Sequence, residues 1–228
     1  MRSSRIMCLA GLAPIAAITA TAWAGGHTWR VNEVFGNNDG TIMFIELKEC
    51  CGSPNEIGTS GAQVTSADLG LIETLGSLGC TNCTANKHIL LATQAFADLP
   101  GAPAPDYIIS PNAFDRTGDG VTYSFYHTLN FGPVPSDGVN SFHWNGDVPA
   151  TVSIAANSPT NFAGDTASIA VRCHVADTDF SGGVDVSDLL NLLADWGPCG
   201  GCATDLDGNG SVDVSDLLAL LAGWGPCP

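Results

Sequence analysis

Short runs in which hydrophobic and polar residues alternate, separated by turn residues, extend from residue 25 to about residue 172. Alternation with a period of two indicates half-buried β-strands, and many short strands of this kind are typical of an all-β sandwich. The turn Gly-Asn-Asn-Asp-Gly at 36–40 predicts a hairpin between the first two strands. The predicted strands are 28–34, 41–48, 88–93, 121–125, 151–155 and 167–172.

The pattern changes in residues 173–228, where an internal repeat appears. The segment Asp-Thr-Asp-Phe-Ser-Gly-Gly-Val-Asp-Val-Ser-Asp-Leu-Leu starts at Asp177, and Asp-Leu-Asp-Gly-Asn-Gly-Ser-Val-Asp-Val-Ser-Asp-Leu-Leu starts 28 residues later, at Asp205. The apolar residues that follow recur every three to four positions and predict a short amphipathic helix in each copy. These apolar positions are Val186, Leu189, Leu190, Leu193 and Trp196, and Val214, Leu217, Leu218, Leu221 and Trp224.

Each predicted helix has a start and a stop encoded beside it. Asp185 and Asp213 can cap the two N-termini, and Gly-Pro follows each Trp. Neither helix can bury its apolar stripe alone, so we expect the two copies to pack against each other with pseudo-twofold symmetry.

The polar residues of each copy fit a twelve-residue calcium loop, which needs oxygen ligands at positions 1, 3, 5, 7, 9 and 12 and a glycine at position 6. Gly182 and Gly210 are the turning glycines. Asp-Gly or Asn-Gly could mark a plain turn in one copy, but this does not explain two copies in the same register. The predicted ligands, with carbonyl oxygens at the seventh position, are Asp177, Asp179, Ser181, Gly183, Asp185 and Asp188, and Asp205, Asp207, Asn209, Ser211, Asp213 and Asp216.

Such oxygen-only sites suit a hard cation, so calcium is the expected cofactor, with two ions bound. Ser181 is a weaker ligand than Asn209, and we therefore expect tighter binding at the second site.

Two calcium loops that are each followed, but not preceded, by a helix resemble type I dockerins. The Trp-Gly-Pro-Cys ends of both repeats are similar to those of the cysteine-bearing dockerin variant. The resemblance implies a dockerin domain at 173–228 that docks, in either of two orientations, onto a cohesin-like module of a scaffold or cell-surface protein. It also implies partner contacts by Val186, Ser187, Val214 and Ser215. The helices depart from the family by having no basic residues, which leaves the identity of the partner open.

The N-terminus predicts export. Arg2 and Arg5 precede an apolar stretch at 6–20, and Ala22-Trp23-Ala24 fits the small-x-small rule for cleavage. We expect a signal peptide at 1–24, cleavage near Ala24, and a secreted or cell-surface protein that does not span the membrane. A membrane anchor is the alternative, but the stretch is shorter than the ~20 residues that a span requires.

Charge narrows the classes of partner. The net charge of −16 becomes −18 once the signal peptide and its two arginines are removed, which argues against nucleic acid as a partner. From residue 173 onward there are nine Asp and no Lys or Arg. These carboxylates repel one another unless a cation neutralises part of their charge.

Eight cysteines remain in the exported chain, in two groups of four. In an exported protein we expect disulfides within two separately stapled domains, while the two Cys-x-x-Cys pairs leave zinc or redox chemistry as alternatives. Each group allows three pairings. For the second group, the dockerin resemblance implies Cys173 with Cys227 and Cys199 with Cys202.

The segments 31–33, 44–47 and 86–93 resemble strands of lamin-tail-like immunoglobulin sandwiches. For the domain at 25–172 the resemblance implies a binding or attachment module without catalytic residues. Cys50-Cys51 and the insertion through Cys83 depart from that pattern and suggest a stapled loop.

Candidate catalytic groups in this domain are few. Glu33, Glu46 and Glu49 could serve glycoside hydrolysis, but we interpret them as solvent-facing strand positions. The five histidines are scattered and are interpreted as surface or satisfied side chains, and Asp115 with Asp119-Gly120 as a turn.

We therefore expect a secreted, non-catalytic binding or adhesion protein that is tethered through a calcium-binding module, with polysaccharide as a candidate ligand. The alternative is a dockerin-borne glycoside hydrolase of a multi-enzyme assembly. The absence of a recognisable catalytic motif favours the first hypothesis.

Overall fold

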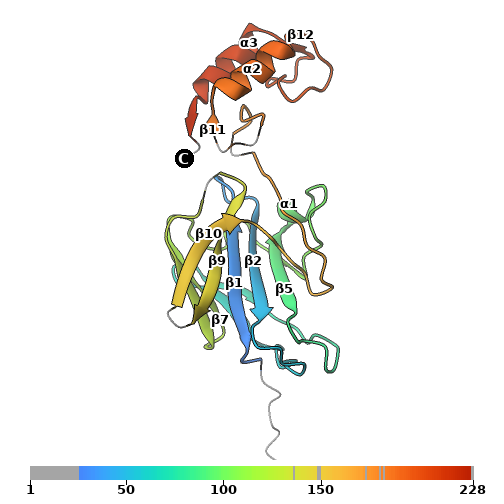
Figure 1. The fold of residues 1–228 in the computed structure, drawn as a ribbon, viewed down its shortest axis with the longest axis vertical. Helices are drawn as coiled ribbons and strands as arrows, with labels where there is room; N and C mark the ends of the chain where they lie inside the picture. The colour runs from blue at the N-terminus through green and yellow to red at the C-terminus, as the bar shows by residue number, and fades with distance from the viewer. Residues whose placement is uncertain are drawn as a thin grey trace, which may run out of the picture.

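The computed structural model describes residues 26–135, 137–147, 150–172, 174–179, 181 and 183–226. A β-rich body is followed by a small body that contains two helices, α2 and α3 (Figure 1). The predicted signal peptide, Cys173, Gly182 and Cys227 lie outside the described residues.

The β-rich body consists mainly of two sheets, so the predicted mainly β class is confirmed and is consistent with a sandwich. Neighbouring strands are antiparallel except β5 and β6, which are parallel. The larger sheet has the order β10 (Ala150–Ala156), β9 (Asn140–Asp147), β1 (Trp29–Gly36), β2 (Met43–Glu49), β5 (His88–Thr93) and β6 (Tyr107–Ile109). The smaller has the order β4 (Gly70–Thr74), β3 (Gln63–Ser66), β7 (Asp119–Tyr123) and β8 (His127–Phe131).

The main core contains residues of both sheets, among them Trp29, Ile45 and Val121. A second cluster contains Phe35 and Phe44 from β1 and β2, together with Phe96 of the short helix α1 (Gln94–Ala97). Both central strands therefore contribute to two separate clusters. Side chains on both faces of these strands are therefore buried, which includes the consecutive apolar residues Val34 and Phe35 of β1 and Met43, Phe44 and Ile45 of β2.

Five of the six predicted strands are confirmed, with ends shifted by a few residues, and β1 and β2 form the predicted hairpin. The predicted strand at 167–172 is wrong: this segment is extended but pairs with no strand among the described residues. Ile169 and Val171 are nevertheless buried in the second cluster. Their alternation reflects burial, which the sequence cannot distinguish from sheet pairing.

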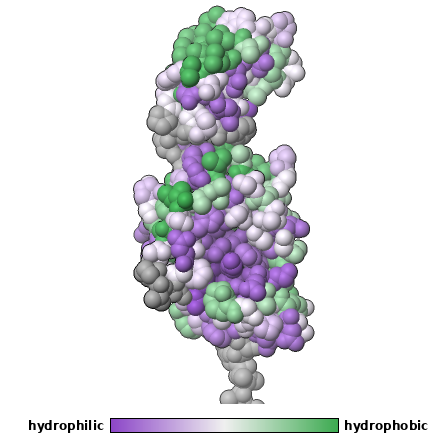
Figure 2. All heavy atoms as spheres, in the orientation of Figure 1, coloured by the Kyte–Doolittle hydropathy of each residue, from purple (hydrophilic) through white to green (hydrophobic). Residues whose placement is uncertain are grey.

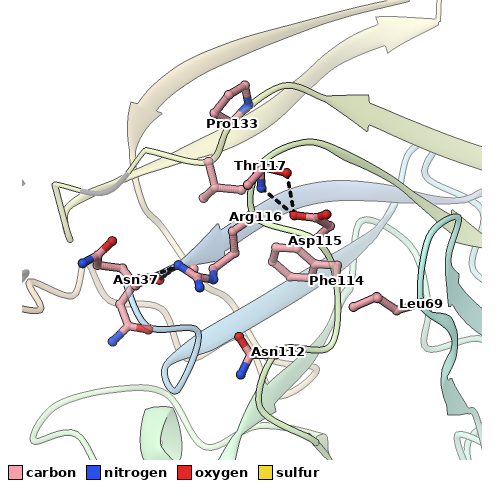
Figure 3. Close-up of a pocket in the computed structure, with 11 residues that line it drawn as sticks. Asn37, Leu69, Asn112, Phe114, Asp115, Arg116, Thr117 and Pro133 are labelled. Carbon is pink, nitrogen blue, oxygen red and sulfur yellow. Dashed lines mark hydrogen bonds between the residues drawn. The ribbon is translucent and has the colours of Figure 1, made fainter. Parts of the chain in front are cut away.

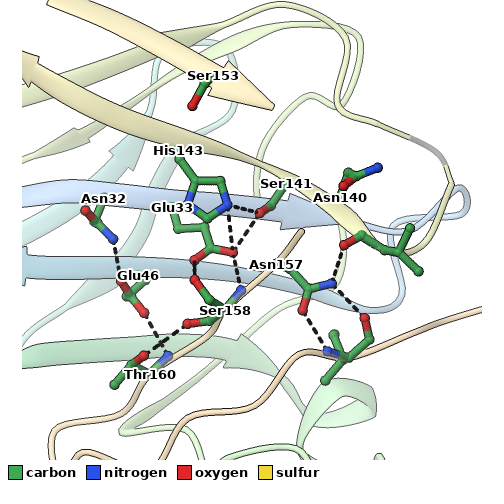
Figure 4. Close-up of polar contacts among 12 residues, drawn as sticks. Asn32, Glu33, Glu46, Asn140, Ser141, His143, Ser153, Asn157, Ser158 and Thr160 are labelled. Carbon is green, nitrogen blue, oxygen red and sulfur yellow. Dashed lines mark hydrogen bonds and ion pairs between the residues drawn. The ribbon is translucent and has the colours of Figure 1, made fainter. Parts of the chain in front are cut away.

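Residues 157–171, called the strap here, cross the larger sheet and are fastened to it by side chains (Figure 4). Glu33 accepts hydrogen bonds from the backbone N–H and the hydroxyl of Ser158, both at 2.9 Å. Glu46 accepts one from the backbone N–H of Thr160 at 2.7 Å. Within the strap, the Asn157 side chain pairs with both the N–H and the carbonyl of Ile169, at 2.7 Å each, and it also donates to the carbonyl of Val139, just before β9, at 2.8 Å. Side-chain hydrogen bonds thus take the place of the backbone hydrogen bonds that would pair a regular strand with the sheet.

This arrangement corrects the interpretation of the three glutamates. Glu33, Glu46 and Glu49 are all buried, not solvent-facing. Burial raises the pKa of Glu33 despite hydrogen bonds from Ser141 and Ser158 that lower it. Glu49 accepts bonds from the backbone N–H groups of Gly52 and Asn86. The prediction that these glutamates face solvent was wrong because both faces of the larger sheet are covered, and the sequence pattern does not show the second cover.

The described cysteines pair locally, as expected for two separately stapled groups. The sulfur atoms lie at bonding distance in Cys50–Cys51, Cys80–Cys83 and Cys199–Cys202. Of the three pairings that the first group allows, the structure has the local one, with Cys50–Cys51 at the start of the insertion and Cys80–Cys83 at its end. The Cys173–Cys227 pairing falls outside the described residues.

No helix in the described part of the chain is long and apolar enough to cross a bilayer.

Candidate metal centres

The two C-terminal repeats form one symmetrical unit. The helices α2 (Val186–Ala194) and α3 (Val214–Ala222) each follow a loop and a two-residue strand. In the first copy β11 (Gly183–Val184) pairs with β14 (Gly225–Pro226) of the second, and β12 (Gly197–Pro198) pairs reciprocally with β13 (Ser211–Val212). Each copy therefore completes the other, as the repeat predicts.

The buried contact between the copies uses equivalent residues. Val184 and Leu192 of the first copy meet Val212 and Leu220 of the second in one cluster. Leu189 and Leu217 are partly buried against it. Mutual packing of the two copies is thus confirmed.

The predicted choice of helix face is largely wrong. Leu192 and Leu220 are fully buried, whereas most of the predicted stripe is exposed. Four leucines in each helix offer two adjacent apolar faces, and spacing alone does not decide which one faces inward. The exposed face, called the outer face here, consists of Val186, Leu190, Leu193 and Trp196 in one copy and Val214, Leu218, Leu221 and Trp224 in the other. Hydrophobic residues gather over the two helices (Figure 2).

Three carboxylates converge in each loop. Oxygen atoms of Asp177, Asp179 and Asp188 lie within 4.8 Å of one another, and so do those of Asp205, Asp207 and Asp216. These residues correspond to predicted positions 1, 3 and 12. Either cluster could hold a metal ion.

Hydrogen bonds from backbone N–H groups hold the carboxylates of the first cluster in position. The N–H of Ser181 donates to Asp177 at 3.0 Å and to Asp179 at 3.1 Å. The two oxygens of Asp188 accept from the N–H groups of Thr178, at 2.6 Å, and Asp185, at 2.9 Å. Asp188 thereby joins the start of the loop to the start of α2.

The second cluster repeats this geometry. The N–H of Asn209 donates to Asp205 and Asp207, at 3.1 and 3.0 Å. Asp216 accepts from Leu206 at 2.7 Å and from Asp213 at 2.8 Å. The same register in both copies indicates that the loops share one function.

The aspartates at position 12 of the two loops, Asp188 and Asp216, have environments that favour the ionised carboxylate. Burial alone would raise the pKa of Asp188 and of Asp216, but backbone hydrogen bonds, led by those from Asp185 and Asp213, outweigh it and lower the pKa of each. Both carboxylates lie in the first turn of a helix, where the helix dipole also favours negative charge.

The other predicted ligands have varied positions. Asp185 and Asp213 cap α2 and α3, as predicted, by accepting from the N–H groups of Ser187 and Ser215 at 2.7 Å, and neither carboxylate belongs to a described cluster. In the first loop the Ser181 hydroxyl donates to the Gly183 carbonyl at 3.2 Å, and in the second the Asn209 side chain accepts from Ser211 at 2.9 Å.

The turn in the second loop matches expectation. Gly210 has φ +91°, a left-handed conformation that favours glycine. Gly182, its counterpart, is not among the described residues.

The donor chemistry fits a hard divalent cation. Each cluster offers carboxylate oxygens alone, and further hydroxyl, amide and carbonyl oxygens occur in the same loops. Nitrogen and sulfur ligands, which softer metals prefer, do not take part in either described cluster.

The glutamates of the sandwich form no comparable open site. Glu33 is covered by Ser158 and lies 3.7 Å from Nε2 of His143 (Figure 4). Glu46 lies 2.8 Å from Nδ1 of His88. Each of these two half-buried histidines thus has a carboxylate neighbour, which the interpretation as surface or satisfied side chains did not specify. Asp119 and Gly120 begin β7, so their interpretation as a turn is wrong, and the turn lies just before them at 116–117. Asp119 accepts hydrogen bonds from Ser66, Ala67, Asp115 and Gly120.

Comparisons with known proteins found no match: no family model, no curated protein and no solved structure is similar to the chain.

Proposed function

We propose that the C-terminal repeats form a dockerin-type module that binds two calcium ions and docks the chain onto a cohesin-like partner. The observation that carries this proposal is the pair of equivalent carboxylate clusters, Asp177, Asp179 and Asp188 and Asp205, Asp207 and Asp216. The clusters occupy equivalent positions in the two repeats, and each connects a loop to the start of a helix. An ion bound at each cluster would therefore fix the positions of the two helices that form the proposed docking surface.

Calcium is favoured over other hard cations by the number and kind of oxygens within reach. It takes six to eight oxygen ligands in flexible geometry, whereas magnesium demands a tighter octahedron and retains water. In the proposed loops the remaining oxygens come from Ser181, Gly183 and Asp185, and from Asn209, Ser211 and Asp213. Neutralising the clustered aspartates couples ion binding to folding of the tail.

The outer face supports docking. Val186 and Leu190 are 58% and 61% exposed, and their equivalents Val214 and Leu218 are 59% and 62% exposed. Such apolar surface on a small module marks an interaction site. Ser187 and Ser215 are exposed beside it. Because the two copies present equivalent faces, a partner can bind either one, in two orientations.

The rest of the proposal concerns the sandwich. We assign it a non-catalytic binding or adhesion role, with a lamin-tail-like immunoglobulin fold. Export after signal-peptide cleavage accords with the local cysteine pairs, because disulfides persist in oxidising compartments. The glycoside hydrolase alternative is disfavoured because Glu33 and Glu46, buried beneath the strap, have no open cleft between them in the two described pockets.

The docking proposal is tested by capture from the host's surface fraction, with calcium and with chelator. The wild-type chain should retain a partner in calcium and release it on chelation. Leu190→Ser with Leu218→Ser should abolish retention, because it makes both outer faces polar. The matched control is Thr128→Ser with Asn130→Ser, on an exposed strand of the sandwich, which should retain the partner.

Retention that survives both chelation and the double outer-face change would contradict the docking proposal. Turnover of a polysaccharide that is abolished by Glu33→Ala or Glu46→Ala would instead establish the hydrolase alternative.

A further inference from the structure

A pocket of about 500 Å³ opens where the β1–β2 turn meets the loop at 112–117 and the chain that follows β8 (Figure 3). It belongs to the sandwich and shares no residue with the metal clusters. Its size is typical of sites for small ligands. The proposed docking role leaves this pocket without a function.

The floor of the pocket is apolar and well packed. Phe114 is only 1% exposed, and its ring contacts the edge of Phe131 with centroids 5.6 Å apart. Val134 is buried beside it, and the exposed Leu69 and Pro133 extend the apolar wall toward solvent. Because Phe114 and Val134 are buried, the apolar surface that a ligand's C–H face can contact is mainly that of Leu69 and Pro133.

The rim carries two carboxamides with spare hydrogen-bonding capacity. The side chains of Asn38 and Asn112 make no hydrogen bond within the part of the chain that the structure describes. The backbone N–H of Asn112 donates to the carbonyl of Gly40 at 2.9 Å, which fixes the position of the residue. Each carboxamide offers both donors and an acceptor, as a ligand with hydroxyl groups requires.

Charge at the rim argues against an anion. The guanidinium of Arg116 donates to the backbone carbonyls of Asn37 and Asn38, so part of its donor capacity is already used. Asp39 and Asp115 also interact with its charge. The rim therefore has no surplus of positive charge, and the net charge of the chain is −16.

A metal cation and a peptide are also disfavoured. The rim carboxylates belong to no described metal cluster. A bound peptide strand would need free backbone groups, but the carbonyls of Asn37 and Asn38 already accept from Arg116. A neutral ligand that has one apolar face and several hydroxyls fits best.

We propose that this pocket binds a pyranose ring of a neutral oligosaccharide, with its C–H face on the exposed Leu69 and Pro133, above the buried Phe114 and Val134, and with its hydroxyls on Asn38 and Asn112. The proposed site assigns a class of ligand, neutral oligosaccharides, to the β-sandwich. It rests on the proposed function only in treating the sandwich as a binding module, and it needs no metal.

The test is calorimetric titration of the full chain with cellohexaose, xylohexaose and mannohexaose, in calcium and in chelator. At least one of the three should bind equally well in both conditions. Asn38→Ala and Asn112→Gly should each weaken that binding by about three- to ten-fold, the loss expected for one hydrogen bond. Glycine is used at Asn112 because its φ is +53°, which alanine tolerates poorly.

The matched control is Asn82→Gly. Asn82 is an exposed asparagine with φ +54° that does not line the pocket, so the same change there should leave affinity unaltered. Equal melting temperatures of the variants would show that the fold is intact.

Absence of binding by all three oligosaccharides would overturn the inference, as would binding that both pocket variants leave unchanged. Tighter binding of polygalacturonate or of hexa-alanine would reassign the pocket to an anion or a peptide. Loss of sugar binding in chelator alone would show that the sugar site lies elsewhere. Calcium binding measured on the same samples reports the tail separately, so the two proposals can fail independently.

Discussion

Single carboxylates organise both parts of this chain by accepting several hydrogen bonds from backbone N–H groups. Asp216 does so at the start of α3, and Asp119 does so at the start of β7, where it accepts from Ala67 at 3.0 Å and from Gly120 at 2.6 Å. Hydrogen bonds to a charged acceptor are stronger than those between neutral groups. Their removal should therefore have measurable effects.

Asp119→Asn should destabilise the sandwich by about 1–3 kcal/mol at neutral pH, because the amide group cannot accept at both former oxygens. Burial alone would raise the pKa of Asp119, but hydrogen bonds from Ser66 and Asp115 help to lower it. The stabilisation is thus complete above the ordinary value of 3.8 and is lost as pH falls below it. Urea unfolding from pH 7 to pH 2 measures this.

The control for that experiment is Asp68→Asn, an exposed carboxylate in the neighbouring loop, which should change stability by less than about 0.5 kcal/mol. A difference between wild type and Asp119→Asn that stays constant down to pH 2 would contradict the assigned role.

The two metal loops differ at position 5, which is Ser181 in the first and Asn209 in the second. Asp177→Ala should remove the first site and leave the tighter second site, and Asp205→Ala should leave the weaker first site. Calcium titration of both variants measures the ranking. Tighter binding by the Asp205→Ala chain would reverse it.

At the scale of elements, the repeat predicts two helices, their caps and their mutual packing, but not which face is buried. Each helix carries consecutive leucine pairs, such as Leu189-Leu190 and Leu192-Leu193, so its apolar arc is too wide to specify one face. Tertiary packing makes the choice. It buries Leu192 and Leu220 and leaves the outer face exposed.

Leu192→Ala should destabilise the helical unit by about 2–5 kcal/mol because it leaves a cavity in the cluster between the copies. Leu190→Ala, the same change two residues earlier at an exposed position, should cost less than about 0.5 kcal/mol. Thermal unfolding in calcium, followed by helical circular dichroism, compares the two variants. Equal losses would mean that the helix is rotated relative to the structure described here.

At the scale of the whole molecule, the change of pattern near residue 172 correctly separates a β-rich part from a helical part. Alternating residues identify β1, and short apolar runs flanked by polar residues identify β2 and β5. The sequence pattern misses short strands such as β3 and β6, and it also misses β9, which has eight residues. The burial of Glu33 also escapes a local pattern, since Ser158 and Ser141 lie far away in the sequence.

The candidate metal sites were easier to predict than the pocket. The three carboxylates of each cluster lie within one twelve-residue segment, a loop and the first turn of the helix after it, so their spacing in the sequence encodes their geometry. The pocket joins the β1–β2 turn to residues near 112–117 and 133–134, and a sequence alone does not show that these segments meet.

The central claim is that the C-terminal repeats bind calcium through the two carboxylate clusters, one in each repeat. Calorimetric titration of the full chain with calcium tests it most directly, with Asp188→Ala and Asp216→Ala combined as the variant and Asp195→Ala, a tail aspartate outside both clusters, as the control. We expect two ions per wild-type or control chain and none at the tail of the double variant. No heat from the wild type, or the same heat from the double variant, would contradict the account.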